Sequence, residues 1–196
     1  MIKIIITLIL LNLSVYGCGV YTTPVPIADI SVEIDAKKDK TSFVITWNFK
    51  EDLLCEHDKN QNNKFDKNEQ DEIIQEYIHH LEKTNYITEI VYVKKAQRIK
   101  KSLIQKIDVK DSKMTFSGMK VKYVYKFEMP FVLQKDHRMF IRFLDPSEKV
   151  EVTLKDIKLK NYHTKSVIVI QDIRANIYFY NHVKKYNKLK DALLQK

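Results

Sequence analysis

The most constraining feature of this sequence is a regular alternation of apolar and polar residues near its beginning. Ile30, Val32 and Ile34 alternate with polar residues, and the same period of two returns at 43–48. Successive side chains of a β-strand point to opposite faces, so this pattern predicts two strands that each bury one face. The polar stretch 37–40 between them predicts a turn, and the three segments together predict a β-hairpin.

From residue 86 onward, short apolar segments follow one another at regular spacing and are separated by polar turns. This arrangement is typical of an antiparallel β-sandwich. The last segment is longer than an ordinary strand, so we expect it to be bulged or split. The expected turns are 110–112, 134–136, 145–147 and 161–163, and the expected strands are 87–93, 103–109, 113–118, 121–129, 138–144, 150–154 and 166–180.

Three segments have a helical pattern. Asn48 followed by Glu51 predicts the start of a short helix at 49–57. A final helix is expected at 183–196, either docked on the sheet, frayed, or lying on a membrane surface. A longer helix is expected at 67–83, and its apolar stripe consists of Ile73, Ile74, Tyr77, Ile78 and Leu81.

The polar segment 58–69 lies between the first two predicted helices and carries oxygen-bearing residues at regular positions. Ca²⁺ prefers six to eight oxygen ligands, and an EF-hand loop of twelve residues supplies them from positions 1, 3, 5, 7, 9 and 12. Position 7 contributes a backbone carbonyl, and position 12 contributes a carboxylate with two oxygens. The residues at these positions are Asp58, Asn60, Asn62, Lys64, Asp66 and Glu69.

Other positions of the loop also fit a calcium site. Asn63 stands at position 6, where the chain turns with positive φ and Asn is a good substitute for Gly. Phe65 fills the hydrophobic position 8, and Asp66 with Glu69 has the spacing of a capping box. The competing interpretation is a simple polar turn. Three lysines in the loop repel a cation, so we expect a modest affinity that suits a site outside the cytoplasm.

These patterns predict an α+β fold class. The expected structure is a mainly antiparallel β-sandwich with an inserted EF-hand-like helix–loop–helix and a short C-terminal helix. The expected organisation along the chain is a signal peptide at 1–17, a linker at 18–29, a β domain at 30–182 with the helix–loop–helix insertion at 49–83, and the helix at 183–196.

The N-terminal segment predicts export. The apolar run Ile4–Val15 is too short to span a bilayer but has the length of a signal-peptide core, with cleavage expected after Gly17. We therefore expect the protein in the periplasm. Cys18 would then be the first residue and a candidate for lipidation. The alternatives are a disulfide between Cys18 and Cys55, which an oxidising compartment permits, or a small buried thiol at Cys55.

Composition excludes several classes of function. The net charge is +9, from 34 basic and 25 acidic residues, but only four of the basic residues are arginines. Arginine is the residue that recognises phosphates and guanine in a bidentate way, and the lysines are spread along the sequence, so no nucleic-acid partner is expected. With only three glycines, the chain has no glycine-rich phosphate loop and no G-x-S-x-G motif.

Glu76, His79 and His80 lie together on the helix predicted at 67–83. Glu76 and His80 are four residues apart and could form part of a transition-metal site. A metal site needs three or four convergent ligands. The preferred interpretation is therefore that both histidines are simply surface or half-buried side chains. His57 is expected in solvent. No catalytic grouping can be argued from the spacing of these residues, and no enzyme is expected.

Four features follow one another along the chain in a recognisable order: the strand Ile30–Ile34, Trp47 with Phe49, the loop 58–69, and the segment Phe140–Pro146. In this order the sequence resembles the DUF1007 family of bacterial periplasmic proteins over essentially the whole mature chain. The family is uncharacterised, is loosely labelled as a periplasmic component of ABC-type uptake systems, and has members linked to transition-metal import. Many members carry His-Pro-His at the mature start, where this chain has Pro26-Ile27-Ala28-Asp29.

The expected function is therefore that of a non-enzymatic periplasmic accessory or binding protein stabilised by Ca²⁺. The resemblance implies an association with an ABC-type uptake system and a membrane transporter component as partner. The alternative is a periplasmic protein that binds or delivers a transition metal, Ni²⁺ or Zn²⁺, through exposed histidines.

Overall fold

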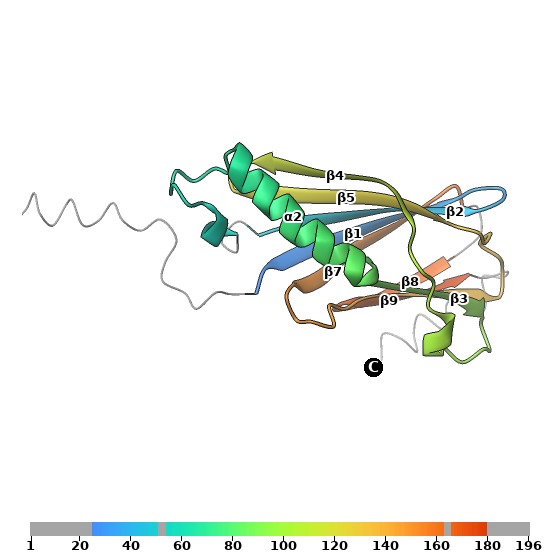
Figure 1. Cartoon of the computed structure of the whole chain (residues 1–196). Coiled ribbons are helices and arrows are strands. Elements are labelled where there is room, and N and C mark those ends of the chain that lie inside the picture. The colour runs from blue at the N-terminus through green and yellow to red at the C-terminus, as the bar shows by residue number, and fades with distance from the viewer. Residues whose placement is uncertain (1–24, 51–53, 163–165, 180–196) are drawn as a thin grey trace, which may run out of the picture.

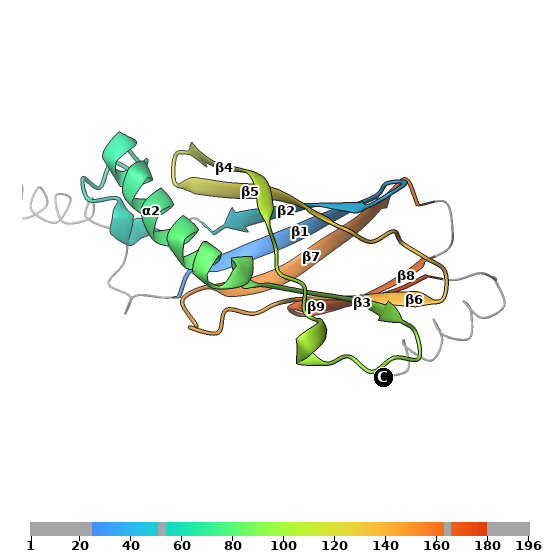
Figure 2. The same cartoon turned by 45° about the vertical axis from the view of Figure 1, so that its right-hand side comes forward.

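Two β-sheets and one α-helix make up the described part of this computed structural model (Figures 1 and 2). The structure describes residues 25–50, 54–162 and 166–179. Apolar side chains from both sheets and from the helix form a single hydrophobic core. The predicted signal peptide at 1–17, the candidate lipid attachment at Cys18 and the predicted helix at 183–196 lie outside the described residues.

The larger sheet contains five of the described strands, in the order β4-β5-β2-β1-β7. Its neighbouring strands are antiparallel except for β1 and β7, which run parallel to each other. The strands are β1 (Ile27–Ala36), β2 (Thr41–Phe49), β4 (Val109–Ser117), β5 (Lys120–Met129) and β7 (Glu151–Lys160).

The smaller sheet contains four of the described strands, in the order β3-β6-β9-β8. All of its pairings are antiparallel. The sandwich-like arrangement is therefore mainly antiparallel, as the sequence predicts. The strands are β3 (Thr88–Lys94), β6 (His137–Phe143), β8 (Ser166–Gln171) and β9 (Arg174–Phe179).

The predicted hairpin is confirmed by the pairing of β1 with β2. Ile30 lies opposite Trp47 and Ile34 lies opposite Phe43. These four side chains are completely buried, whereas Ser31 and Glu33, which point to the other face of β1, are half-buried. The alternation read from the sequence therefore directs one face of the hairpin into the core, where burial of apolar surface stabilises it.

Helix α2 (Lys67–Lys83) has the bounds that the sequence predicts. Asp66 is its N-cap, and a capping box with Glu69 is present, which fixes the first turn. Ile73, Tyr77 and Leu81 face the core at helical spacing. The Tyr77 ring meets the Phe49 ring edge to face, with centroids 5.5 Å apart, so the helix packs where strand β2 ends (Figures 1 and 2).

The helix predicted at 49–57 is wrong at its start, and among its described residues only a single 3₁₀ turn at its end is helical. Phe49 continues the alternation of β2, since it pairs with Ala28 on one side and Val121 on the other. Residues 51–53 lie outside the described part of the chain, and only the short 3₁₀ helix η2 (Cys55–His57) follows. Pairing on both sides of β2 outweighs the local capping signal, because tertiary context overrides helix propensity.

The strand predicted at 103–109 and the turn predicted at 110–112 are also wrong. After the 3₁₀ helix η4 (Lys101–Leu103) the chain is irregular, and β4 begins at Val109. Apolar Ile107 is buried as part of a loop, and its N–H donates to the Asn85 Oδ1 at 2.9 Å. Asp111 lies within β4 opposite Lys126, next to a register shift after Val109. A β-bulge accommodates a polar residue that otherwise favours a turn.

Two other boundaries differ from the prediction. Strand β1 begins at Ile27, inside the segment 18–29 that the sequence predicts as a linker, and β7 continues past Leu154 to Lys160. A register shift at Lys155 changes the phase of the alternation in β7, so that the next buried residue after Leu154 is Ile157. The long segment 166–180 is split, as expected, into β8 and β9 by a turn in which Asp172 has a φ of 48°.

Candidate functional site

The loop 58–69 connects η2 to α2, and its side-chain oxygens bind its own backbone. Asp58 accepts hydrogen bonds from the N–H of Asn62 at 3.1 Å and of Asn63 at 2.9 Å. The Asn60 Oδ1 accepts from Asn62 N at 3.1 Å, and the Asn62 Oδ1 accepts from Lys64 N at 3.0 Å. The oxygens at positions 1, 3 and 5 are thereby turned toward the inside of a tight loop.

The left-handed turn predicted at Asn63 is confirmed. Asn63 has a φ of 59°, and Gln61, which the sequence did not single out, has a φ of 56°. Asn tolerates this conformation better than most residues because its short polar side chain can bond locally. Two left-handed residues within three positions coil the backbone closely enough for the carboxylate of Asp58 to reach both N–H groups across the loop.

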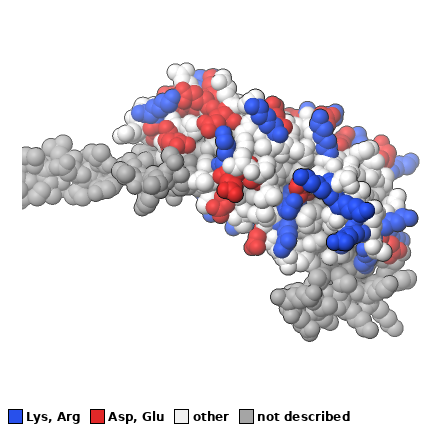
Figure 3. All heavy atoms as spheres, turned by 60° about the horizontal axis from the view of Figure 1, so that its bottom comes forward, with Lys and Arg blue, Asp and Glu red and all other residues white. Residues whose placement is uncertain are grey.

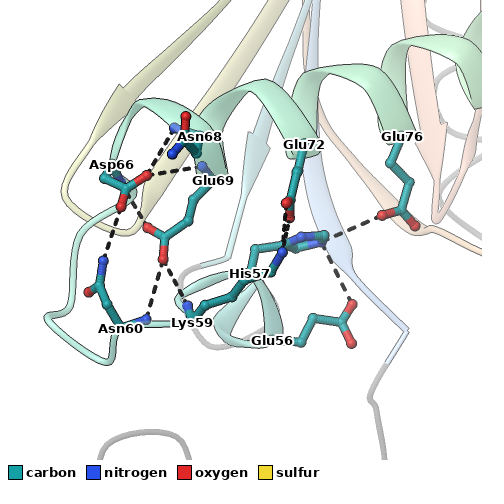
Figure 4. Close-up of polar contacts among 9 residues, drawn as sticks. All are labelled: Glu56, His57, Lys59, Asn60, Asp66, Asn68, Glu69, Glu72 and Glu76. Atoms are coloured by element: carbon teal, nitrogen blue, oxygen red, sulfur yellow. Dashed lines mark hydrogen bonds and ion pairs between the residues drawn. The ribbon is translucent and has the colours of Figure 1, made fainter.

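Glu69 closes the loop from the first turn of α2 (Figure 4). Its Oε1 accepts from Lys59 N at 2.8 Å and Asn60 N at 3.4 Å, and its Oε2 accepts from Asp66 N at 2.8 Å. Asp66 in turn accepts from Asn68 N at 2.9 Å. Glu69 therefore holds the two ends of the loop together through one carboxylate. Its place in the loop, position 12, is the one that supplies the bidentate ligand of an EF-hand.

The charges around the loop leave its carboxylates without a cationic partner in the described part of the chain. Asp58 is 6% exposed and Glu69 is 3% exposed. The nearby lysines turn elsewhere, since the Lys59 Nζ pairs with Glu72 at 2.5 Å and the Lys67 Nζ pairs with Asp71 at 2.7 Å. Burying a negative charge is unfavourable unless positive groups or hydrogen bonds compensate it. Among the described residues, the compensating groups at Asp58 and Glu69 are backbone N–H donors.

The basic and acidic side chains are not mixed evenly over the surface. On the face shown in Figure 3, Asp and Glu gather toward the end of the molecule that carries the loop and the start of α2, and Lys and Arg predominate toward the other end. Lysines spread along the sequence are thus brought together by the fold. The acidic end favours a bound cation even though the whole chain is basic.

The loop is anchored to the sheet through Phe65 at position 8. Phe65 is buried and lies edge-on to Phe116 of β4, with ring centroids 6.1 Å apart. Its N–H points to the carbonyl of Gly118 at 3.5 Å, and its own carbonyl accepts from the Gln70 side chain at 2.7 Å. Gly118 has a φ of 62°, so the turn between β4 and β5 presents its carbonyl to the loop. The loop is therefore supported by a β-turn.

The described structure departs from an EF-hand in two respects. The entering helix is reduced to η2. In addition, no three His, Cys, Asp or Glu side chains converge in a metal-holding arrangement among the described residues. The six predicted ligands Asp58, Asn60, Asn62, Lys64, Asp66 and Glu69 share one loop, but the Asp66 Oδ2 accepts from the Asn60 amide at 3.1 Å and does not join the other carboxylates.

Of the three histidines discussed, only His57 is placed differently from the prediction. It is buried, at 8% exposure, where the sequence predicts a solvated side chain. His79 is exposed and His80 is half-buried, as the preferred interpretation has them. The His80 Nε2 lies 2.9 Å from the Asp145 carboxylate, and Glu76 is 3.8 Å from the Nε2 of His57. The alternative in which Glu76 and His80 form part of a metal site is therefore not seen in this structure.

Asp145 is a structural centre that the sequence did not reveal. It is 5% exposed, and its two oxygens accept from the N–H and hydroxyl of Ser147 and from the N–H groups of Lys149 and Val150. Burial acts to raise the pKa of Asp145, but the hydrogen bonds from Ser147 and His80 act the other way, and the net pKa lies below the ordinary aspartate value.

Asp145, His80 and Ser147 do not form a hydrolytic triad. In a triad the carboxylate holds one ring nitrogen of histidine and the nucleophile contacts the other. Here the Asp145 Oδ2 and the Ser147 hydroxyl both face the Nε2 of His80, at 2.9 and 3.4 Å. The trio instead fastens the turn after β6 to helix α2.

Cys55 is disulfide-bonded, so it is neither the free thiol that accompanies a lipidated Cys18 nor a simple buried thiol. The chain has one other cysteine, Cys18, which lies outside the described residues. We expect the protein to take up no thiol-alkylating reagent in denaturant until a reductant is added, as measured by intact mass. Alkylation of Cys55 before reduction, or a diacylglycerol mass on Cys18, would contradict the expectation of a disulfide-bonded protein.

Comparisons with known proteins identify no relative of this chain. No protein-family model matches the chain, and no curated protein is significantly similar to it. The resemblance to the DUF1007 family therefore rests on the quoted residues alone. Of the helices in the described residues, none combines the length and the apolar character needed to cross a bilayer.

Proposed function

We propose that this protein is a non-enzymatic calcium-binding accessory protein of the periplasm, with loop 58–69 as its calcium site. One observation carries the proposal. Asp58 and Glu69, at the first and last positions of the loop, are both buried carboxylates, and among the described residues their hydrogen-bond donors are all backbone N–H groups. A carboxylate has about four lone-pair sites, so each can accept these hydrogen bonds and still bind a metal ion.

The residues of the loop suit a hard cation. The groups that would hold Ca²⁺ are the side-chain oxygens of Asp58, Asn60, Asn62, Asp66 and Glu69 and the carbonyl of Lys64, all of them oxygen ligands. Bound Ca²⁺ would supply the positive charge that the buried carboxylates lack. The backbone bonds of Asp58 and Glu69 already fix the two ends of the loop, so little ordering is left for binding.

The wider role remains part of the proposal. The apolar start of the chain and its resemblance to DUF1007 proteins favour an exported protein that serves an ABC-type uptake system, with a membrane transporter component as partner and no nucleic acid. Only three of the six loop ligands carry charge, and such a loop suits the higher calcium concentrations found outside the cytoplasm.

Calcium titration tests this function. We expect the metal-free full chain to bind one Ca²⁺ with measurable heat, and to melt at a higher temperature in millimolar Ca²⁺ than in chelator. Mg²⁺ at the same concentration should give a smaller shift, because Mg²⁺ demands a stricter octahedral geometry and gives up its water reluctantly. The absence of both heat and a melting shift at millimolar Ca²⁺ would show that the segment is only a turn.

One observation favours the alternative function, a periplasmic protein that binds or delivers Ni²⁺ or Zn²⁺. It does not come from the exposed histidines of α2, since His80 is engaged by Asp145. It comes from His57, whose Nε2 is buried and has no hydrogen-bond partner in the described structure.

A further inference from the structure

His57 is the one histidine of the described residues whose buried ring nitrogen lacks a hydrogen bond. Its side chain is nine-tenths buried, at 10% exposure, and the Nε2 lies 3.8 Å from Glu56 Oε1 and 3.8 Å from Glu76 Oε2 (Figure 4). These distances are too long for hydrogen bonds. A buried polar atom without a partner is unfavourable and calls for a specific explanation, such as a bound water or ion.

The surroundings of His57 hold the ring in place, and two exposed glutamates lie beside its buried Nε2. The Tyr77 ring lies edge-on to the imidazole, with centroids 6.2 Å apart. Glu56 belongs to η2 and Glu76 to α2, and their side chains are 51% and 59% exposed. A fixed imidazole therefore lies next to two carboxylates that are exposed enough to adjust their position.

The three groups do not hold a metal ion as they stand, but the separations of the two carboxylates from His57 are close to those between metal ligands. Ligands about 2.1 Å from a tetrahedral metal lie about 3.4 Å from one another. The two separations of 3.8 Å exceed this by a few tenths of an ångström, which a small rotation of an exposed glutamate removes. The nitrogen ligand selects the metal, because imidazole suits Zn²⁺, Ni²⁺ and Cu²⁺, whereas Ca²⁺ prefers oxygen alone.

We propose that His57, Glu56 and Glu76 form a second cation site, which binds a divalent transition metal such as Zn²⁺ with water completing its coordination. The site goes beyond the calcium proposal and gives the alternative function a definite set of ligands. It shares no ligand with loop 58–69. It does share the flanking elements, since His57 directly precedes Asp58, and Glu76 follows Glu69 by two turns of α2, on the same side of the helix.

Zn²⁺ titration of the full chain, with and without saturating Ca²⁺, tests the proposal. We expect one Zn²⁺ per chain, and at least tenfold weaker binding in Glu76→Gln and in Glu56→Gln. Glu72→Gln is the matched control, because it removes the same charge from the same helix while its partner is Lys59. His79→Ala controls for the exposed histidine. Both controls should bind Zn²⁺ as the wild type does.

A spectroscopic readout and a fold control complete the experiment. Co²⁺ in place of Zn²⁺ should give the visible absorption of a four- or five-coordinate site in wild type and lose it in Glu76→Gln, while circular dichroism shows that the variant is folded. Glu69→Gln should keep its Zn²⁺ affinity while it loses Ca²⁺, so the two sites fail separately. Equal Zn²⁺ binding in wild type and Glu76→Gln, or no Zn²⁺ binding in wild type, would overturn the proposal and leave His57 as an ion-paired imidazole.

Discussion

Glu69→Gln is expected to abolish most of the rise in melting temperature that Ca²⁺ gives the wild-type protein. At a hundredfold excess over the dissociation constant, a ligand that binds only the folded state stabilises it by about 2.7 kcal/mol. For a chain of this size that corresponds to a shift of roughly 5–10 °C. Gln supplies one neutral oxygen in place of a two-oxygen carboxylate, so the ligand that closes the loop is lost.

The comparison must separate the loss of calcium from damage to the metal-free fold. Glu69 also accepts from Asp66 N and takes part in the capping box, so the variant should be less stable even in chelator. The relevant quantity is therefore the difference between the melting temperatures with Ca²⁺ and with chelator, measured for each protein. Glu72→Gln, an exposed neutralisation on the same helix, should retain the wild-type difference. A full calcium shift in Glu69→Gln would refute the assignment of position 12.

Asp145→Ala should lower the free energy of unfolding by about 3 kcal/mol, because it leaves the buried N–H of Val150 and its neighbours without an acceptor. It also removes the carboxylate that binds the Nε2 of His80. Chemical denaturation measures the change. Glu148→Ala, in the same turn but exposed, is the control and should change stability little. An Asp145→Ala protein as stable as Glu148→Ala would show that the turn does not depend on this carboxylate.

The contribution of Asp145 to the free energy of unfolding should also depend on pH. Its pKa is lower in the folded protein than its ordinary value, so the unfolded chain binds the proton more tightly. The stabilisation is therefore complete above the unfolded value of about 3.9 and is lost as the pH falls through the folded value. Hydrogen bonds from Lys40 and Lys37 lower the pKa of Glu128 to about 2, so wild type loses stability in acid at that group too. The difference between wild type and Asp145→Ala isolates Asp145, and it should shrink toward low pH.

Much of the fold follows from local patterns. The bounds of α2 are predictable because its capping box and apolar stripe belong to the same short segment. The β1–β2 hairpin is predictable because its alternation is uninterrupted. The end of β2 is not, since Phe49 is held in the strand by Ala28 and Val121, which come from two other strands. The irregular segment before β4 escapes prediction for the same reason, because Ile107 is buried through contacts that its local sequence does not show.

The candidate site is also predictable from the sequence only where its contacts are local. The loop hydrogen bonds of Asp58 and Glu69 join residues at most ten positions apart, and the EF-hand spacing anticipates them. The sequence predicts His57 in solvent because it lies beside a polar loop, but its ring is buried and packs against Tyr77 of α2. The contact between His80 and Asp145 spans helix α2 and the turn after β6. No spacing rule within one segment could find it.

The parallel pairing of β1 with β7 bears on the order in which the chain folds. Strand β1 meets β2 across a short turn, but its other edge stays open until β7 arrives, with Ile27 opposite Glu151. Closing so long a stretch of chain is entropically costly and slows folding. Until then, the unpaired edge of β1 is a template for strands of other chains. The larger sheet cannot be completed until residues 151–160 have been synthesised. This delay would suit the exported protein that we propose, because an incompletely folded chain can be threaded through a secretion channel. The exposure of the β1 edge to aggregation ends only when β7 docks.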